Sequence, residues 1–462
     1  MSSVDASSAS AASLSAIRTP SMIQVLMTIM GLAIPFALGA AVTSSLNLGK
    51  VALLSRAPDT GALHELSLLQ PSFVLILAIM EGLAITNQVF SAKSRNNWPR
   101  RGVLRASRRL SIIGAALFMA VAAIGYALPH FVEINDPILA QTVALFPLFV
   151  LSMTLFAIFD IYFGAMRGQG RIMLGLLPFA GLVVIDLAVT FVLVSQYGWG
   201  FEAVLIGNLS GAGLMLPVIV WLLKREVADG EESPDQPFRI RIRQLQIGVG
   251  IPVFSSLVVG FISASVAFPL LAKLGQEQVS AFFVILRYRI AFMIPAIAIG
   301  SAIAILVNQA AEEDAGTSRL RFLTIGVPVM LVLYIGATLG VSQWSGILNL
   351  LVPADAEGAL YSATETMFNL LLVTFFLVAG SAMMQVILEQ LGRGGQVFAI
   401  TALIELGTCG VLVWVMQEGA TVADIATIFN GFALLGFVLF ALQMLLLIRK
   451  LKIQQAETSD AV

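Results

Sequence analysis

Long apolar segments follow one another along almost the whole chain, separated by short polar stretches. A helix needs about 20 mainly apolar residues to cross a hydrocarbon layer of ~30 Å, and each segment reaches that length. The pattern therefore predicts an all-α membrane protein. We expect twelve membrane-spanning helices, at residues 23–54, 68–92, 110–129, 139–166, 173–195, 202–223, 247–272, 279–310, 322–342, 362–388, 396–416 and 423–448.

Composition agrees with this prediction. Hydrophobic residues make up 58% of the 462 residues and charged residues only 11%, whereas a soluble domain has ~25% charged residues. The net charge of −1 identifies no partner, and we expect no nucleic-acid partner. Residues 1–19, which are rich in serine and alanine, are expected to be a disordered N-terminus, and residues 451–462 a similar C-terminal tail.

Positive charges lie on one side of the predicted helices. The loop after the second helix, the later even-numbered loops and both termini carry most of the lysines and arginines, whereas the odd-numbered loops carry few. Cytoplasmic loops of membrane proteins have this excess of basic residues. We therefore expect a multi-pass protein of the inner (cell) membrane with both termini in the cytoplasm.

The most charged internal stretch, residues 224–246, divides the chain into two sets of six predicted helices, at 20–223 and 247–450. A glycine-rich turn follows the fourth helix (AMRGQGR, 165–171), and another follows the tenth (QLGRGGQ, 390–396). Since six is an even number, both sets enter the membrane from the same side. We therefore expect two six-helix lobes, joined by a cytoplasmic linker and related by a pseudo-two-fold axis along the membrane normal, as in several transporters.

Few charged residues lie inside the predicted helices, and charges at membrane depth are usually functional. Three carboxylates are candidates for proton coupling, because a carboxylate in a low-dielectric cavity can carry a proton: Asp186, Glu81 and Glu405. Candidates for a substrate cavity are Lys50, Asn47, Thr43, Gln88, Thr190, Asn208 and Arg287.

Lys50 is the only charge in the first apolar segment. Thr43, Asn47 and Lys50 have the spacing i, i+4, i+7 and form one polar stripe, which favours a water-filled face. Alternatively, the span ends near Leu46 and Lys50 meets the lipid headgroups. Because a buried unpaired ammonium is unfavourable, the first interpretation predicts an ion pair with a carboxylate such as Glu81 or Asp186.

Catalytic chemistry has little support. The only two histidines lie in predicted loops, and no metal-ligand cluster, nucleophile elbow or phosphate-binding loop is found. We expect no enzymatic activity, no cofactor and no metal.

Several segments resemble the multidrug and toxic compound extrusion (MATE) transporters, within the larger group that includes polysaccharide and lipid-linked-precursor exporters. These segments are AIPFALGAAVTSSLNLGKVALLSR (33–56), the stretch at 66–97, the AMRGQGR turn, GWGFEAVLIGNLSG (198–211) and ILRYRIAFMIPAIAIGSAIAILVNQ (285–309). Arg287 matches a common family arginine. The family often has an aspartate where this chain has Lys50, and some members have acids near Gly260 and Ser381, so no sodium site is carried over.

The resemblance implies an exporter that moves a small organic or amphiphilic molecule out of the cytoplasm by alternating access. We expect it to be a monomer in the lipid bilayer, coupled to protons in preference to sodium ions. The alternative is a flippase of a lipid-linked sugar or another anionic amphiphile. A major facilitator transporter is more distant, because its Gly-Asp-Arg-Arg pattern is absent from SAKSRNNWPRRG (91–102).

Overall fold

The computed structural model describes residues 21–54, 66, 69–131, 137–228, 235–272, 274, 276–310, 319–343, 348 and 358–460, and their regular structure is helical. The helices of the first half are α1 (Met22–Leu54), α3 (Gln70–Lys93), α4 (Gly102–Phe131), α5 (Pro137–Gly168), α6 (Ile172–Tyr197), α7 (Phe201–Glu226) and α8 (Asp235–Leu245). Those of the second half are η1 (Gln246–Gly250), α9 (Ile251–Ala272), α10 (Gln276–Gln309), η2 (Phe322–Gly326), α12 (Val327–Ser342), α13 (Gly358–Leu388), η4 (Glu389–Arg393), α14 (Gly394–Gln417) and α15 (Val422–Asp460).

Eleven stretches of the described chain are long and apolar enough to cross a membrane. One of them, Tyr361–Gln417, is 57 residues long and contains both α13 and α14. These two helices meet at η4, where Gly392 has a φ of +82°. Such a left-handed backbone favours glycine and lets the chain reverse. The chain is therefore a multi-pass membrane protein, as its apolar pattern predicts.

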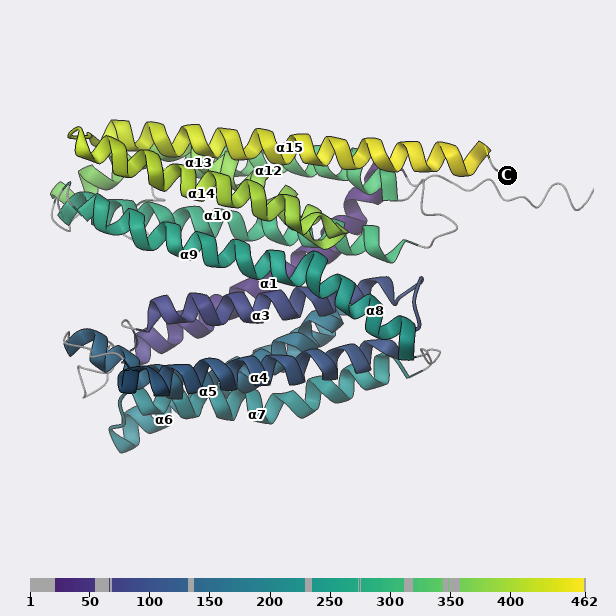
Figure 1. Cartoon of the computed structure of the whole chain (residues 1–462), viewed down its shortest axis with the longest axis horizontal. Helices are drawn as coiled ribbons and strands as arrows, with labels where there is room; N and C mark the ends of the chain where they lie inside the picture. Colours follow the sequence, from purple (N-terminus) through teal and green to yellow (C-terminus); the bar gives the residue numbers. More distant parts are fainter. Residues whose placement is uncertain are drawn as a thin grey trace, which may run out of the picture.

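The long helices form two groups that lie side by side (Figure 1). Helices α3 to α7 form the first group, and α9 to α15 form the second. Each group has its own hydrophobic core, around Phe118 and Phe159 in the first and around Ile303 and Met383 in the second. Helix α8 lies at one end of the bundle, which we call the α8 end, and the last turns of α15 extend in the same direction.

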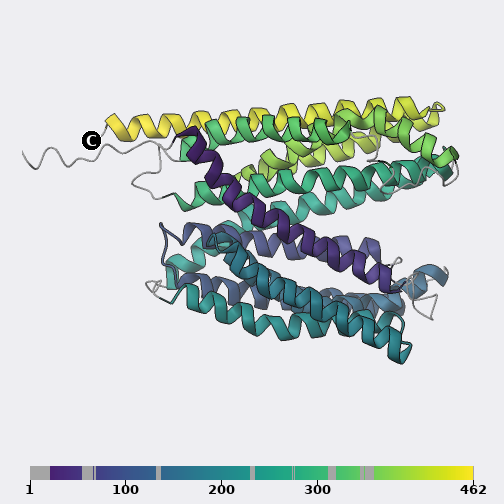
Figure 2. The ribbon, with the colours of Figure 1, turned by 180° about the vertical axis from the view of Figure 1, so that it is seen from behind.

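Helix α1 contacts both groups. Figure 2 shows it crossing from the second group at the α8 end to the first group at the opposite end. Accordingly, Val25 and Ile29 lie in the core of the second group, whereas Leu54 packs against Val194 and Val204 of the first. A movement of one group relative to the other would therefore act on α1 directly.

Two polar segments, the charged linker and the expected C-terminal tail, contain helix. The linker at 224–246 contains the helix α8, which packs against the first group because Phe238, Ile242 and Leu245 form an apolar stripe. The expected C-terminal tail is helical as far as Asp460, as the end of α15. Both segments are polar, but they are rich in residues that favour helices, and their polarity does not prevent helix formation.

Small residues allow close contacts between helices. A Cβ atom added at Gly164 of α5 would lie 2.6 Å from the carbonyl oxygen of Ala84 in α3. Likewise, a Cβ at Gly82 of α3 would lie 2.9 Å from the carbonyl oxygen of Gly250 in η1, where the two groups meet. Small residues at such positions are typical of membrane helix contacts, since lipid provides no hydrophobic driving force between helices.

Replacing Gly164 with alanine is expected to destabilise the protein by about 1–3 kcal/mol, because the added methyl group forces two helix backbones apart. Thermal unfolding of the purified protein in detergent measures this effect. Gly410→Ala in α14 is the matched control, since a Cβ there meets no atom within 4 Å. Equal melting temperatures for the two variants would show that the α3–α5 contact is not close.

Candidate functional site

A buried ion pair joins α1 to α6. The Lys50 ammonium lies 2.8 Å from a carboxylate oxygen of Asp186, and the two residues are only 7% and 1% exposed. Lys50 lies in the last turns of α1 and Asp186 near the middle of α6. The predicted ion pair of Lys50 is thus confirmed, with Asp186 as the partner. A lysine buried to this extent does not fit the alternative in which it meets the lipid headgroups.

Polar side chains of neighbouring helices surround this pair. The Lys50 ammonium also donates a hydrogen bond to the amide oxygen of Asn208 in α7. The Asn208 amide nitrogen donates to the hydroxyl of Ser152 in α5 at 3.0 Å, and the Thr190 hydroxyl donates to the second Asp186 oxygen at 3.4 Å. These five side chains, on four helices, form what we call the Lys50 site. They supply the hydrogen bonds that buried polar groups require.

Glycines of α7 let this helix approach the ion pair. A Cβ atom at Gly207 would lie 2.3 Å from the Thr190 hydroxyl and 2.6 Å from the Asp186 carboxylate. One turn on, a Cβ at Gly211 would lie 2.6 Å from the carbonyl oxygen of Leu182. Since every other residue type has a Cβ, glycine at both positions is needed for α7 to cover Asp186 so closely.

Glu81 belongs to a different cluster. It is half-buried in α3 and interacts electrostatically with Asp160 and Arg167, both of α5, and with Glu389 of η4. The Arg167 guanidinium lies 3.7 Å from an Asp160 oxygen and 5.1 Å from the centre of the Phe163 ring. Glu81 and Glu389 therefore interact across the contact between the two groups.

Gln88 also lies where the two groups meet. Its amide nitrogen donates a hydrogen bond to the side-chain oxygen of Gln390 in η4 at 3.0 Å. Gln309, at the end of α10, donates to the carbonyl oxygen of Gly168 and accepts from the Arg95 guanidinium at 3.1 Å. Asn96 and Asn97 donate hydrogen bonds to the backbone carbonyls of residues 309 and 310. These amide side chains connect the two groups, and we call them the amide latch: Gln88, Asn96, Asn97, Gln309 and Gln390.

The second group contains a further pair of charges. Glu405 of α14 is half-buried and interacts electrostatically with Arg289 of α10. The remaining candidates Thr43, Asn47 and Arg287 lie in helices α1 and α10, but their side chains are outside the described residues. Within the described part of the chain, no group of three or more metal-ligating side chains is found.

Sequence reasoning missed several of these contacts. It singled out Asp186, Thr190, Asn208 and Lys50 separately, and the fold brings them together, but it did not identify Ser152. Gln309 and Gln390 were also missed, although Gln390 opens the second glycine-rich turn. A glutamine at the end of an apolar segment gives no signal of its own, since such positions usually meet water.

Solved structures show which proteins share this architecture. An outward-facing multidrug resistance MATE family transporter of the MOP superfamily is 16% identical to this chain, with a TM-score of 0.78. The alignment covers 94% of this chain and 99% of that protein. A MATE transporter from Vibrio cholerae, solved as an aspartate-to-asparagine mutant, has a TM-score of 0.80 at 13% identity, with the same coverage.

A MOP superfamily transporter from Pyrococcus furiosus, described as having a binding pocket of reverse polarity that suggests a different function, is 15% identical with a TM-score of 0.78. Its alignment also covers 94% of this chain and 99% of that protein. No protein-family model and no curated protein matches the sequence. The fold of the chain is therefore that of MATE transporters, which confirms the resemblance seen in the sequence at the level of the fold.

Proposed function

We propose that this protein is a secondary active exporter of the MATE type, coupled to protons at the Lys50 site. The single observation that carries the proposal is a buried Lys50–Asp186 ion pair, hydrogen-bonded to side chains of neighbouring helices, inside a bundle with the MATE fold. Charged side chains at membrane depth are unfavourable and mark ion or substrate pathways. A purely structural role would be served at lower free energy by apolar side chains of similar volume.

Asp186 is the proton-binding group in this proposal. When Asp186 is ionised, the Lys50 ammonium neutralises it, and both charges remain buried. When a proton reaches Asp186, the ion pair is lost, and Lys50 and Asn208 must change their hydrogen bonds. Proton binding thus changes the contact between α1 and α6, and since α1 also contacts the second group, the change reaches both groups.

Lys50 also favours protons over sodium ions. Oxygen atoms of Asp186 and Asn208 are the ligands that a sodium ion would use, and the ammonium already occupies both. The ammonium is a cation that the protein supplies itself. A free metal cation would have to displace it against strong charge repulsion.

The transport cycle follows from the arrangement of the two groups. We propose twelve spans, with α13 and α14 as separate ones, in two six-helix lobes at residues 20–223 and 247–450. The α8 end faces the cytoplasm, with both termini, as the basic loops predict. The amide latch then closes the cytoplasmic side of the protein. When the lobes rock about this latch, the opposite side opens and the cargo leaves there.

The cargo is a small organic or amphiphilic molecule that binds between or within the lobes. Gln88, Thr190 and Asn208 remain candidates for its contacts, with Thr43, Asn47 and Arg287. A flippase of a lipid-linked sugar is the second candidate function, because the half-buried Arg289, with Glu405 as its electrostatic partner, would suit an anionic amphiphile. We place the protein in the inner membrane as a monomer.

Purified protein in liposomes tests the proposal. An outward-directed substrate gradient is expected to drive proton movement in the opposite direction, and an imposed pH gradient is expected to drive substrate transport. Substrate flux that follows a sodium gradient and ignores the pH gradient would contradict proton coupling. Movement of a lipid-linked sugar between leaflets, with no flux of soluble organic cations or anions, would favour the flippase.

A further inference from the structure

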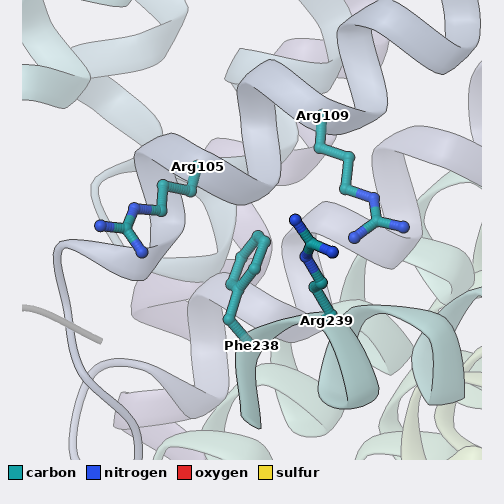
Figure 3. A pocket seen from close by; sticks show the side chains of 4 residues that line it. All are labelled: Arg105, Arg109, Phe238 and Arg239. Atoms are coloured by element: carbon teal, nitrogen blue, oxygen red, sulfur yellow. The ribbon is translucent and has the colours of Figure 1, made fainter. Parts of the chain in front are cut away.

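A pocket of about 410 Å³ at the α8 end is lined by three arginines and one phenylalanine: Arg105, Arg109, Phe238 and Arg239. Arg105 and Arg109 are one turn apart on α4, and Arg239 comes from α8. Figure 3 shows Arg239 extending from α8 toward Arg109, with the Phe238 ring between Arg105 and Arg239. The pocket thus lies between the first group and the helix that connects it to the second.

Helix α8 packs against α3 and the segment that follows it. Phe238 is buried, and its ring packs edge to face with the Phe90 ring at a centroid distance of 5.7 Å. The Arg241 guanidinium lies over the Trp98 ring, 5.0 Å from its centre. Because these contacts place α8 beside the first group, Arg109 and Arg239 line the same pocket although both are positively charged. An anion between them would relieve their repulsion, and phosphate fits the fork of a guanidinium group.

The face of α4 that carries the two arginines continues as an apolar face. Residues 105, 109, 112 and 119 follow the helical spacing i, i+4, i+7, i+14 and share one side of the helix. Ile112 and Met119, at 61% and 58% exposed, lie on this side within the candidate span Gly102–Phe131. Ile240 of α8, next to Arg239, is also exposed. A ligand of this pocket would therefore have its charge at the membrane surface and an apolar part along α4.

We propose that the pocket binds the phosphate headgroup of an anionic phospholipid, whose acyl chains lie along Ile112 and Met119. Arg105, Arg109 and Arg239 hold the phosphate, and the exposed side of α4 receives the chains. A free phosphate ion would use the same arginines, but it would gain nothing from the apolar side. The bound lipid connects α4 to α8 and so holds the linker helix to the first group.

Native mass spectrometry of the purified protein, titrated with phosphatidylglycerol and with phosphatidylethanolamine, tests this proposal. We expect tighter binding of the anionic lipid. The variant R105Q/R109Q/R239Q is expected to weaken phosphatidylglycerol binding about tenfold or more, since each arginine near a membrane surface contributes substantially to the attraction. The matched control, R108Q/K224Q/R243Q, removes the same number of charges from exposed residues outside the pocket and is expected to change binding less than about twofold.

The single variants R109Q and R239Q keep the test valid if the triple variant does not fold. Equal weakening by pocket and control variants would overturn the proposal, because it would mean diffuse attraction by the basic surface. The apolar contact has its own test in I112S/M119S, which is expected to weaken lipid binding and leave the affinity for inorganic phosphate unchanged. Competition by inorganic phosphate, with no effect of I112S/M119S on lipid binding, would assign the pocket to a free anion instead.

Discussion

Transport by Asp186→Asn is expected to lose its pH dependence, while the substrate still binds. An amide in place of the carboxylate keeps the size and the hydrogen bond to Thr190 but cannot bind a proton. The same change leaves the Lys50 ammonium buried without a counter-charge, and breaking a buried pair in this way costs about 3–5 kcal/mol. The measurements are initial rates of transport in liposomes across a pH series, substrate binding in detergent and thermal unfolding.

The double variant K50M/D186L separates the two effects. Removing both charges relieves the unpaired ammonium, so its melting temperature is expected to return toward that of the wild type. Transport by this variant should nevertheless lack pH dependence, because no proton-binding group remains in the Lys50 site. If Asp186→Asn transports with the wild-type pH profile, another group carries the proton. Glu81 is the next residue to test, and Glu405 after it.

The sequence predicts most of the architecture but little of how its charges are paired. Apolar length alone locates the helices, because a bilayer tolerates few other structures. It does not predict that α1 packs against both groups, since Val25 and Leu54 have the same apolar character. The sequence leaves two carboxylates, Glu81 and Asp186, as possible partners of Lys50. Asp186 is the partner, because α1 packs against α6.

Glu81 illustrates why the remaining contacts were not predictable. Its depth in α3 suggested the same role as Asp186, yet it interacts with Asp160, Arg167 and Glu389. Glu389 is 308 positions further along the chain, and no local pattern connects positions so far apart. The same holds for the amide latch, whose members come from the ends of three helices and one turn. Such contacts depend on how the two groups meet.

Gln309→Ala is expected to shift the protein toward the state that is open at the α8 end. Gln309 contacts the first group through three hydrogen bonds: to the Gly168 carbonyl, from Arg95, and from Asn96 to its own carbonyl. The alanine variant loses the two that involve the side chain and leaves a buried carbonyl without its partner. The loss is about 2 kcal/mol in favour of separation, or about thirtyfold in the equilibrium between the two states.

Distances between spin labels placed at the α8 end on α3 and α10, in a Cys409→Ser background, measure this shift. Gln417→Ala is the matched control, because Gln417 is exposed at the opposite end of α14 and its truncation should leave the distances unchanged. Since the latch is proposed to close the cytoplasmic side, the Gln309 variant should also bind substrate more tightly from that side and export it more slowly. Unchanged distances in Gln309→Ala would mean that the apolar contact between Gly82 and Gly250, and not the amides, keeps the two groups together.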